Sequence, residues 1–383
     1  MTWQVINGNN IDILKTYPDN YFDSIVTDPP YGIEFLGKDW DKNTGPIETW
    51  KECLRVLKPG GYLLAFSAAR TYHRLATNIE DVGFEIKDQL MWIYSTGFPK
   101  AQDVGKMIQK KQGVKEYEGF VDTTKNAGFG MTDHARVRAG VEWSTKAEQV
   151  GSPKCTSEEA KKWEGWKTAM KPAHEPIVMA RKPMKGTTVD NVLTYGTGAL
   201  NIDESRVGDE VVTTNYKVNS QGKSFGYEGD VEWEDRGSYE NTGRYPSNVI
   251  GEIHEYQKYF YQPKVSKNER NVGCDDIEEK QYSHDGREKH IENPYQRQNS
   301  VSSNNHPTVK PVELMKYLVR LVTQNGGTVL DPFNGSGSTG MACVELKMNY
   351  VGCELDEAYV EIANKRIAAW EEKHSTPFNN LFE

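Results

Sequence analysis

Strand-like and helix-like segments alternate in three parts of the chain, and this alternation restricts the fold more than any other feature of the sequence. Short strand-like runs, several of them apolar, predict strands at residues 23–27, 62–66, 84–94, 175–180, 328–330 and 350–353. Apolar residues at helical spacing predict helices at residues 48–57, 71–82, 312–323, 338–346 and 357–370. The first helix is expected to stop at the turn-like sequence Lys58–Gly61. This order predicts an α/β fold, a doubly wound and mostly parallel sheet with helices on both faces.

Two polar, glycine-rich segments interrupt this alternation. Loops of such length are uncommon inside a compact domain unless they have a function, so we interpret both as inserts that project from the sheet. The expected organisation is one half of the sheet in 1–99, a basic insert in 100–168, a returning sheet strand in 169–183, a second insert in 184–305 and the other half of the sheet in 306–383.

The composition is typical of a soluble protein, with 37% hydrophobic and 26% charged residues. No stretch approaches the roughly 18 consecutive apolar residues of a membrane span. The first residues lack the basic-then-apolar pattern of a secretion signal, so we expect a cytoplasmic protein. The five cysteines are widely spaced and include no Cys-x-x-Cys pair, which predicts buried thiols and no metal site.

Charge is distributed unevenly along the chain. The formal net charge of −9 by itself argues against a nucleic-acid partner. Residues 100–185, however, contain 17 Lys and Arg against 11 Asp and Glu, with Trp143, Trp163 and Trp166 among them. This segment is either a solvated insert of mixed charge or a surface that follows DNA phosphates, and charge alone does not decide between the two.

The decapeptide Asp331–Gly340 is a glycine-rich connection between a predicted strand and a predicted helix, where such folds hold a nucleoside cofactor. Glu354 ends the next predicted strand about 20 residues later, where an acid can accept hydrogen bonds from ribose hydroxyls. The turn has neither a Walker lysine nor a Gly-x-Gly-x-x-Gly pattern, so a nucleoside without phosphates, such as S-adenosylmethionine, fits better than ATP or NAD. The alternative is that Gly335 and Gly337 only allow tight packing.

The tetrapeptide Asp28-Pro29-Pro30-Tyr31 follows the predicted strand 23–27, at the end of a parallel strand where such sheets bind ligands. It provides a carboxylate, a rigid turn with a backbone carbonyl, and an aromatic ring. These groups suit the exocyclic amino group of a nucleobase turned out of the duplex. Asp28 would accept one N–H, the Pro29 carbonyl the other, and Tyr31 would stack on the base. The structural alternative is that Asp28 caps a turn.

Together the two motifs resemble the amino-methyltransferases of DNA, which act on adenine N6 or cytosine N4, in their permuted β class. In that class the Asp-Pro-Pro-Tyr turn precedes the cofactor turn, as it does here. His306–Pro311 is similar to the family's segment before the cofactor turn. Phe35–Asp41, Trp166–Pro183 and Pro263–Arg270 resemble stretches found in phage and prophage members. The resemblance covers the three parts of the chain with alternating strands and helices.

The resemblance implies S-adenosylmethionine as the cofactor and assigns residues to the site. The implied catalytic residues are Asp28, Pro29, Pro30 and Tyr31. The residues expected around the cofactor are Asn9, Asp28, Thr308, Lys310, Asp331, Phe333, Gly335, Ser336, Gly337, Thr339, Glu354 and Leu355. Within this set Thr308 and Lys310 are expected at the methionine end and Glu354 at the ribose. Asn9 departs from the family, which usually has Gly-Asp where this chain has Gly-Asn.

The implied partner is double-stranded DNA, with the target sequence read by the inserts, mainly 184–305. The residues expected to contact DNA are Trp40, Arg136, Arg138, Lys161, Lys162 and Lys167. Trp40 is alternatively a core aromatic. The sequence shows no endonuclease domain, which favours a solitary or phage-borne methylase. A restriction-modification partner and a homodimer are both left open.

The implied activity is methylation of adenine N6 in duplex DNA with base flipping. Cytosine-N4 methylation is the alternative, because it needs the same residues; cytosine enzymes of the family more often have Ser at the first motif position, so Asp28 favours adenine. Methylation of a glutamine amide in a protein is opposed by the motif order and by Asp in place of Asn. A catalytically silent DNA-binding module is opposed by the presence of both motifs.

Overall fold

The computed structural model describes residues 1–33, 41, 43–94, 101–114, 117–118, 154–219, 233–251, 265–277, 280–281, 301–306 and 308–375. Within these ranges the packing separates two compact units. The first contains the described residues of Met1–Ser95, His174–Ile291 and Ser300–Glu383, and the second contains the described residues between 101 and 173.

The first unit is built on an eight-stranded sheet with the strand order β1-β14-β13-β2-β3-β7-β4-β10. The strands are β1 (Trp3–Asn7), β14 (Asn349–Glu354), β13 (Thr328–Asp331), β2 (Phe22–Thr27), β3 (Leu57–Phe66), β7 (His174–Arg181), β4 (Glu85–Ile93) and β10 (Val249–Gly251). β7 is antiparallel to its neighbours β3 and β4, and all other pairs of neighbours in this sheet are parallel. The predicted α/β fold with a mostly parallel sheet is confirmed.

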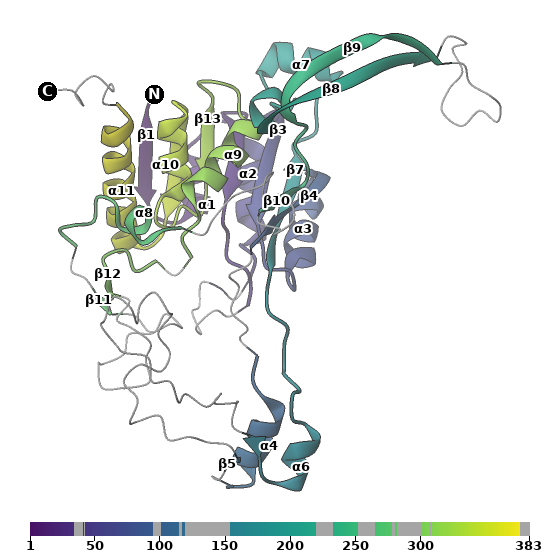
Figure 1. Ribbon diagram of the computed structural model, residues 1–383. Helices are drawn as coiled ribbons and strands as arrows, with labels where there is room; N and C mark the ends of the chain where they lie inside the picture. Colours follow the sequence, from purple (N-terminus) through teal and green to yellow (C-terminus); the bar gives the residue numbers. More distant parts are fainter. Residues whose placement is uncertain are drawn as a thin grey trace, which may run out of the picture. The chain divides into compact units, whose positions relative to one another are not determined.

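Helices cover both faces of this sheet (Figure 1). One face carries α1 (Asn10–Lys15), α2 (Ile47–Val56) and α3 (Tyr72–Asp81), and the other carries α9 (Val312–Val322), α10 (Ser338–Glu345) and α11 (Glu357–Ser375). Neighbouring strand residues pack to opposite faces: Ile25 and Leu63 contact the first set of helices, and Val26 and Leu64 the second. Burial on both faces explains the continuous apolar runs in the central strands β3 and β7.

Most predicted elements end within a residue or two of the observed ones, but Lys58–Gly61 does not form the expected turn. These residues belong to β3, which follows α2 directly. A Cβ on Gly61 would lie 2.8 Å from Leu57 Cδ1 and 2.9 Å from the Asp23 carbonyl oxygen. The glycine therefore allows close packing at the start of a strand, and its turn-like sequence misled the prediction.

The sequence pattern predicts neither β1 nor α1, because these elements have only five and six residues. α11 extends to Ser375, beyond the predicted end at residue 370. Elements as short as β1 and α1 show too little periodicity to be recognised. The end of α11 is missed because the helix loses its apolar pattern where it leaves the core.

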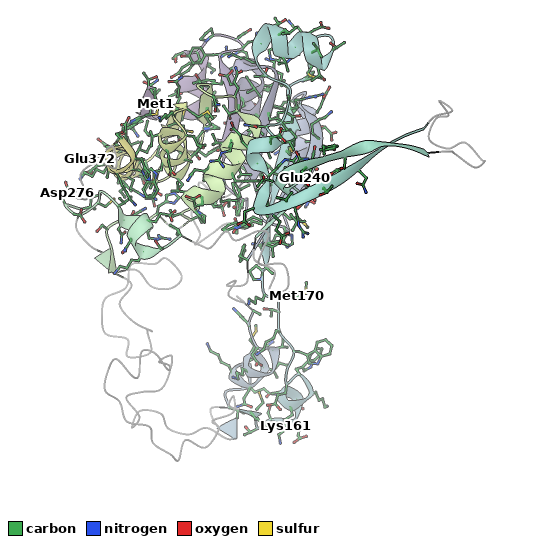
Figure 2. All side chains as sticks on the ribbon, turned by 45° about the horizontal axis from the view of Figure 1, so that its top comes forward. Met1, Lys161, Met170, Glu240, Asp276 and Glu372 are labelled. Carbon is green, nitrogen blue, oxygen red and sulfur yellow. The ribbon has the colours of Figure 1, made fainter. Side chains whose placement is uncertain are left out.

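The described residues of 184–305 do not all project from the sheet. α7 (Thr188–Tyr195) packs against β3, and Asn191 Nδ2 donates to the Pro59 carbonyl oxygen at 2.9 Å. β10 extends the sheet beside β4. β8 (Val207–Asn219) and β9 (Trp233–Arg244) form a separate antiparallel ribbon, on which Glu240 is exposed (Figures 1 and 2). The remaining short elements are a 3-10 helix (Asp203–Ser205), α8 (Lys267–Asn271), β11 (Lys280–Gln281) and β12 (Val301–Ser302).

The second unit contains the helices α4 (Val104–Lys111) and α6 (Glu158–Lys162), which pack together. Two-residue strands, β5 (Tyr117–Glu118) and β6 (Lys154–Cys155), pair beside them. A Cβ on Gly105 would lie 2.8 Å from the Ala160 carbonyl oxygen, so the glycine permits the close approach of the two helices.

All five cysteines are buried and free, which confirms the prediction of buried thiols. Within the described ranges, no helix combines the length and the apolar character needed to cross a membrane.

Candidate active site

The two sequence motifs lie at the carboxyl ends of neighbouring parallel strands. β2, which leads into Asp28–Tyr31, pairs with β13, which leads into Asp331–Gly340. The strand ends are joined directly, because the Thr27 hydroxyl donates to Asp331 Oδ1 at 2.6 Å. Residues 304 positions apart in the sequence therefore share one end of the sheet, which is where parallel sheets bind ligands.

Asp331 is buried and ties the glycine-rich turn together. Its Oδ2 accepts a hydrogen bond from Thr339 Oγ1 at 2.7 Å, and its Oδ1 accepts one from the Phe333 backbone N–H at 3.1 Å. Burial raises the pKa of Asp331 to about 6, although the hydroxyls of Thr27 and Thr339 favour its charged form. One side chain thus links the strand end, the turn and the first turn of α10.

Gly335 and Gly337 both have left-handed backbone conformations, with φ of 53° and 81°. A Cβ on Gly335 would lie 2.8 Å from His306 Nε2, and one on Gly337 would lie 3.1 Å from Ile367 Cδ1. Conformation and close packing are by themselves sufficient reasons for glycine at these positions. A role for the two residues in cofactor binding therefore stays a prediction.

Ser336 is held by a buried arginine that the sequence pattern does not identify. Arg366, which is 0% exposed, donates to the Ser336 backbone oxygen and, at 3.0 Å, to its hydroxyl. It also donates to the Glu269 carbonyl oxygen at 3.2 Å. Burial lowers the pKa of Arg366 to about 10, which leaves the guanidinium charged at neutral pH. α11 thus fixes the middle of the turn through one side chain.

Glu354 ends β14 beside the same turn. Its Oε2 accepts a hydrogen bond from the Gly335 backbone N–H at 2.8 Å, and its Oε1 accepts one from the Asp356 N–H at 2.9 Å. Burial raises the pKa of Glu354 to about 7. Each carboxylate oxygen keeps a further lone pair, so the two oxygens can still accept hydrogen bonds from neighbouring hydroxyls of a ligand.

Four other predicted cofactor residues surround these strand ends less closely. The Asn9 side chain caps α1, which follows β1, the neighbour of β14. Phe333 packs against Trp50, with ring centres 5.8 Å apart. Thr308 is exposed, and Leu355 is 70% exposed. Thr308 and Leu355 thus have free surface for a ligand, and the assignment of all four to the cofactor stays a prediction.

Asp28, Tyr31, Glu175 and Lys310 form a hydrogen-bonded cluster at the end of β2. The Tyr31 hydroxyl lies 2.8 Å from Asp28 Oδ1 and 2.9 Å from Glu175 Oε2. Lys310 Nζ donates to Asp28 Oδ2 at 2.5 Å and to the Tyr31 hydroxyl at 3.1 Å. The same Nζ lies 3.4 Å from Glu175 Oε2 and 4.8 Å from the centre of the Phe66 ring. Two carboxylates therefore face one ammonium group.

The charges in this cluster depend on each other. Burial raises the pKa of Asp28 and the charge of Glu175 raises it further, while Lys310 acts in the opposite direction. Burial disfavours the charge of Lys310, but the two carboxylates together raise its pKa above the usual value. Burial and the same carboxylates raise the pKa of Tyr31 well above its usual range, so the phenol keeps its proton. With both carboxylates ionised, the cluster has one surplus negative charge.

Asp41 fixes the backbone that follows the Asp-Pro-Pro-Tyr motif. Its Oδ1 accepts hydrogen bonds from the N–H groups of Tyr31 at 2.6 Å and Gly32 at 3.0 Å, and its Oδ2 accepts one from Ile33 at 3.3 Å. Asp41 is 1% exposed. A buried carboxylate that accepts several backbone N–H groups holds one loop conformation, which places the Tyr31 ring.

Four residues of this region are not identified by the sequence pattern: Thr27, Asp41, Glu175 and Arg366. Two of them carry a signal in retrospect. Glu175 is an acid at the start of an apolar strand, and Asp41 ends one of the family-like stretches. Thr27 and Arg366 carry none, because their partners are set by the strand order and by helix packing.

The predicted DNA contacts fall only partly within the described residues. Residues outside them are Trp40, Arg136 and Arg138, as well as 35–40 and 263–264 of two family-like stretches. Lys161 Nζ lies 3.4 Å from Glu158 Oε1 on α6, and Lys162 is exposed on the same helix. Lys167 donates to Asp103 Oδ2 at 2.6 Å, and this hydrogen bond lowers the pKa of Asp103.

The residues at the two strand ends fit S-adenosylmethionine. The surplus negative charge around Asp28 suits a sulfonium cation, and Glu354 suits a ribose. The His306 ring lies against Gly335, and burial lowers the pKa of His306 to about 3, so an uncharged ring lies beside the turn.

Comparison with known proteins agrees with this fit. Residues 22–365 match the N6/N4 family of DNA methylases. The Type II methyltransferase M.HindIII of Haemophilus influenzae is 22% identical over 98% of this chain and 97% of its own length. The Type II methyltransferase M.HpaI of Haemophilus parainfluenzae is 21% identical over 96% of this chain and 74% of its own.

Two solved structures also match this chain along most of its length. The complex of M1.HpyAVI with S-adenosylmethionine has 17% sequence identity and a TM-score of 0.41 over 95% of this chain and 100% of that chain. The PvuII DNA methyltransferase, described as cytosine-N4-specific, has 12% identity and a TM-score of 0.47 over 98% and 93%. The family match spans most of the sequence. The chain therefore belongs to the N6/N4 DNA methylase family, and it is a methyltransferase that depends on S-adenosylmethionine.

Proposed function

We propose that this protein is a site-specific DNA methyltransferase that transfers a methyl group to the exocyclic N6 of adenine, after the base has left the duplex. The observation that supports the proposal is the position of Asp28 and Tyr31 at the strand end joined to Asp331. A methyl donor on the glycine-rich turn and a base on the Asp-Pro-Pro-Tyr motif then face each other at one end of the sheet.

Asp28 and the Pro29 carbonyl accept the two N–H groups of the target amine in this proposal. The amino nitrogen of adenine shares its lone pair with the ring and is a poor nucleophile. Acceptors on both N–H groups favour the tetrahedral nitrogen that forms as the methyl group arrives, so the stabilisation grows toward the transition state. Tyr31 stacks on the extruded base. Solvent takes the amine proton after transfer.

The turn residues hold the donor in place. Bound S-adenosylmethionine supplies the activated methyl group. Glu354 accepts hydrogen bonds from the ribose hydroxyls, and Lys310 faces the methionine carboxylate. Asp331 keeps the turn in its conformation through its own hydrogen bonds. Positioning of this kind supplies much of the rate of a direct transfer, because both reactants are held at short range.

Cytosine-N4 methylation is the alternative, since its amine is held by the same groups. Asp at the first position of the motif favours adenine, by the resemblance given above. The same resemblance supports the permuted β class, because the Asp28 motif precedes the Asp331 turn in the chain. A solitary or phage-borne enzyme in the cytoplasm of a bacterium is the setting that fits these features.

We place phosphate contacts on the second unit. Trp163 and Trp166 are 44% and 61% exposed there, with ring centres 5.3 Å apart, and Lys161 and Lys162 lie next to them in the sequence. Exposed aromatic rings among lysines are typical of surfaces that bind nucleic acids. Lys167 is a weaker candidate than the sequence predicts, because its ammonium is bonded to Asp103. Reading of the target sequence is assigned to 184–305.

The experiment that tests the function is incubation of the protein with S-adenosylmethionine and duplex DNA, followed by digestion and identification of the nucleosides by mass spectrometry. N6-methyladenine is the expected product. N4-methylcytosine would replace the proposal with its alternative. DNA without any methylated base, in the presence of protein that binds the cofactor, would contradict both.

A further inference from the structure

Both oxygens of the Asp28 carboxylate are already engaged in the protein without substrate. Oδ1 lies 2.8 Å from the Tyr31 hydroxyl, and Oδ2 accepts a hydrogen bond from Lys310 at 2.5 Å. The proposed function, on which this inference rests, requires Asp28 to accept an N–H group of the target amine. Each oxygen keeps a further lone pair, but a carboxylate paired with an ammonium group is a weaker acceptor, so Asp28 binds the amine most strongly once these partners move away.

Glu175 is within reach of both partners. Its Oε2 lies 2.9 Å from the Tyr31 hydroxyl and 3.4 Å from Lys310 Nζ. The phenol has one proton, so it donates to only one of the two carboxylates at a time. Glu175 belongs to β7, which is held between β3 and β4, and its own position is therefore set by the sheet.

Release of these partners without a second acceptor would be costly. A buried ammonium or hydroxyl group that loses its partner costs much more than the net gain of an ordinary hydrogen bond. With Glu175 in place, a small shift of the Lys310 and Tyr31 side chains exchanges one carboxylate for another. The number of hydrogen bonds and the charge balance of the cluster stay the same, and an Asp28 oxygen becomes free.

We propose that Glu175 is a positioning residue that takes the Tyr31 hydroxyl and the Lys310 ammonium from Asp28 when the target base enters. Glu175 does not contact the reacting atoms in this scheme. Its role is to leave Asp28 ionised and open toward the amine. The sequence pattern gives no reason to assign a function to this position on the antiparallel strand.

The charges around Asp28 provide a second readout. The groups that face Asp28 are Lys310, Glu175, Tyr31 and, from β13, Asp331, while Tyr94 faces Glu175. The charge of Glu175 raises the pKa of Asp28. Replacement of Glu175 by a neutral side chain therefore lowers the pKa of Asp28. Asp28 is then protonated only at lower pH, so the enzyme should stay active to lower pH.

The test is Glu175→Gln, compared with wild type and with Glu313→Gln, a control on the exposed part of α9. We expect kcat to fall about ten- to a hundredfold, which is the effect of losing one hydrogen bond to a charged group. The affinity for S-adenosylhomocysteine, measured by calorimetry, should stay within about threefold of wild type. The acid limb of the kcat–pH profile should move to lower pH.

The double variant Tyr31→Phe/Glu175→Gln isolates the exchange. Tyr31→Phe keeps the ring that stacks on the base but removes the hydroxyl that occupies Asp28. We expect Glu175→Gln to lower kcat less in the Tyr31→Phe protein than in wild type, because the Tyr31 hydroxyl that Glu175 would accept is absent there.

Several outcomes would overturn the inference. They are a kcat for Glu175→Gln within twofold of wild type, an unshifted acid limb, or an equal loss in both backgrounds. A lower melting temperature with an unchanged pH profile would show that Glu175 only supports packing. Absence of DNA methylation by the wild-type protein in the same assay would instead contradict the proposed function itself, so the two failures are distinguishable.

Discussion

The two strand ends that form the candidate site hold their carboxylates in different ways. Asp331 and Glu354, beside the glycine-rich turn, accept hydrogen bonds from hydroxyl and backbone N–H groups. Asp28, one strand away, is bonded to the Lys310 ammonium and shares the Tyr31 hydroxyl with Glu175. The donors in the first arrangement are uncharged groups, whereas the second arrangement contains the ion pair of Lys310 and Asp28.

This difference indicates which side is preformed. The donors around Asp331 and Glu354 are uncharged hydroxyl and backbone N–H groups of the turn and of the strand ends beside it, so we expect no exchange of partners on the cofactor side. The partners of Asp28 share the oxygens that the target amine would use, and one of them is a cation, so we expect the base side to rearrange. We therefore expect substitutions on the cofactor side to change affinity for the donor, and substitutions on the base side to change the rate of transfer.

The largest expected effect comes from Asp28→Ala. Loss of the acceptor for the target amine should lower kcat by about a thousandfold or more, because it removes a contact that strengthens in the transition state. Binding of S-adenosylhomocysteine, measured by calorimetry, should remain close to that of wild type. Asp28→Asn is the matched control, since it keeps the size of the side chain. Measurable turnover by Asp28→Ala at the wild-type rate would remove Asp28 from the mechanism.

Glu354→Ala should have the opposite signature. We expect the dissociation constant for S-adenosylhomocysteine to rise about ten- to a hundredfold, because two acceptors for the ribose are lost. At saturating S-adenosylmethionine, kcat should recover most of its wild-type value. If Asp28→Ala and Glu354→Ala weakened cofactor binding equally, the contrast between the two strand ends would be wrong.

The raised pKa values on the cofactor side predict how stability depends on pH. Burial raises the pKa of Glu354 from 4.5 to about 7 and that of Asp331 from 3.8 to about 6. The folded protein thus binds protons that the unfolded chain has released. The contribution of the protonated groups to stability is present below about pH 4 and is lost as the pH rises through about 6 to 7.

The melting temperature of the cofactor-free protein tests this sign. Between about pH 5 and pH 7.5 it should fall more steeply for wild type than for Glu354→Gln, which stays neutral. Parallel curves would show that burial does not raise the pKa of Glu354. Added S-adenosylhomocysteine should reduce the fall, because the ribose hydroxyls favour the charged carboxylate.

A smaller effect is expected from Gly335→Ala. The left-handed conformation and the 2.8 Å approach to His306 should together lower the free energy of unfolding by about 1–3 kcal/mol. Gly326→Ala is the control, because Gly326 also has a positive φ of 77° but no atom lies within 4 Å of a Cβ built there. Chemical unfolding should show a larger loss for Gly335→Ala. Equal losses would mean that the His306 contact relaxes freely.

Much of this fold follows from the sequence because its strands are buried on both faces. The runs that became β13 and β14 are mostly apolar, β2 contains Ile25 and Val26, and turn residues follow each of the three, so the sequence predicts their type and order. β7 illustrates the limit: its apolar run predicts a strand, but nothing in the run predicts that it pairs antiparallel between β3 and β4. Direction and neighbours are set by packing at a distance.

The candidate site shows the same limit. Asp28 and Asp331 are visible in the sequence because each follows a strand in a distinctive turn. Glu175 and Thr27 are not, since their importance arises only from the strand order that places them beside those acids. Lys310 is predicted at the methionine end, but its bond to Asp28 joins residues 282 positions apart and is visible only in the structure.

A crystal structure of the protein with S-adenosylhomocysteine would test most directly whether the two strand ends form one site. We expect ribose hydroxyls within hydrogen-bond distance of Glu354 and the sulfur atom on the side of the ligand that faces Asp28. A nucleoside bound away from Glu354, or a sulfur atom directed away from Asp28, would contradict this expectation.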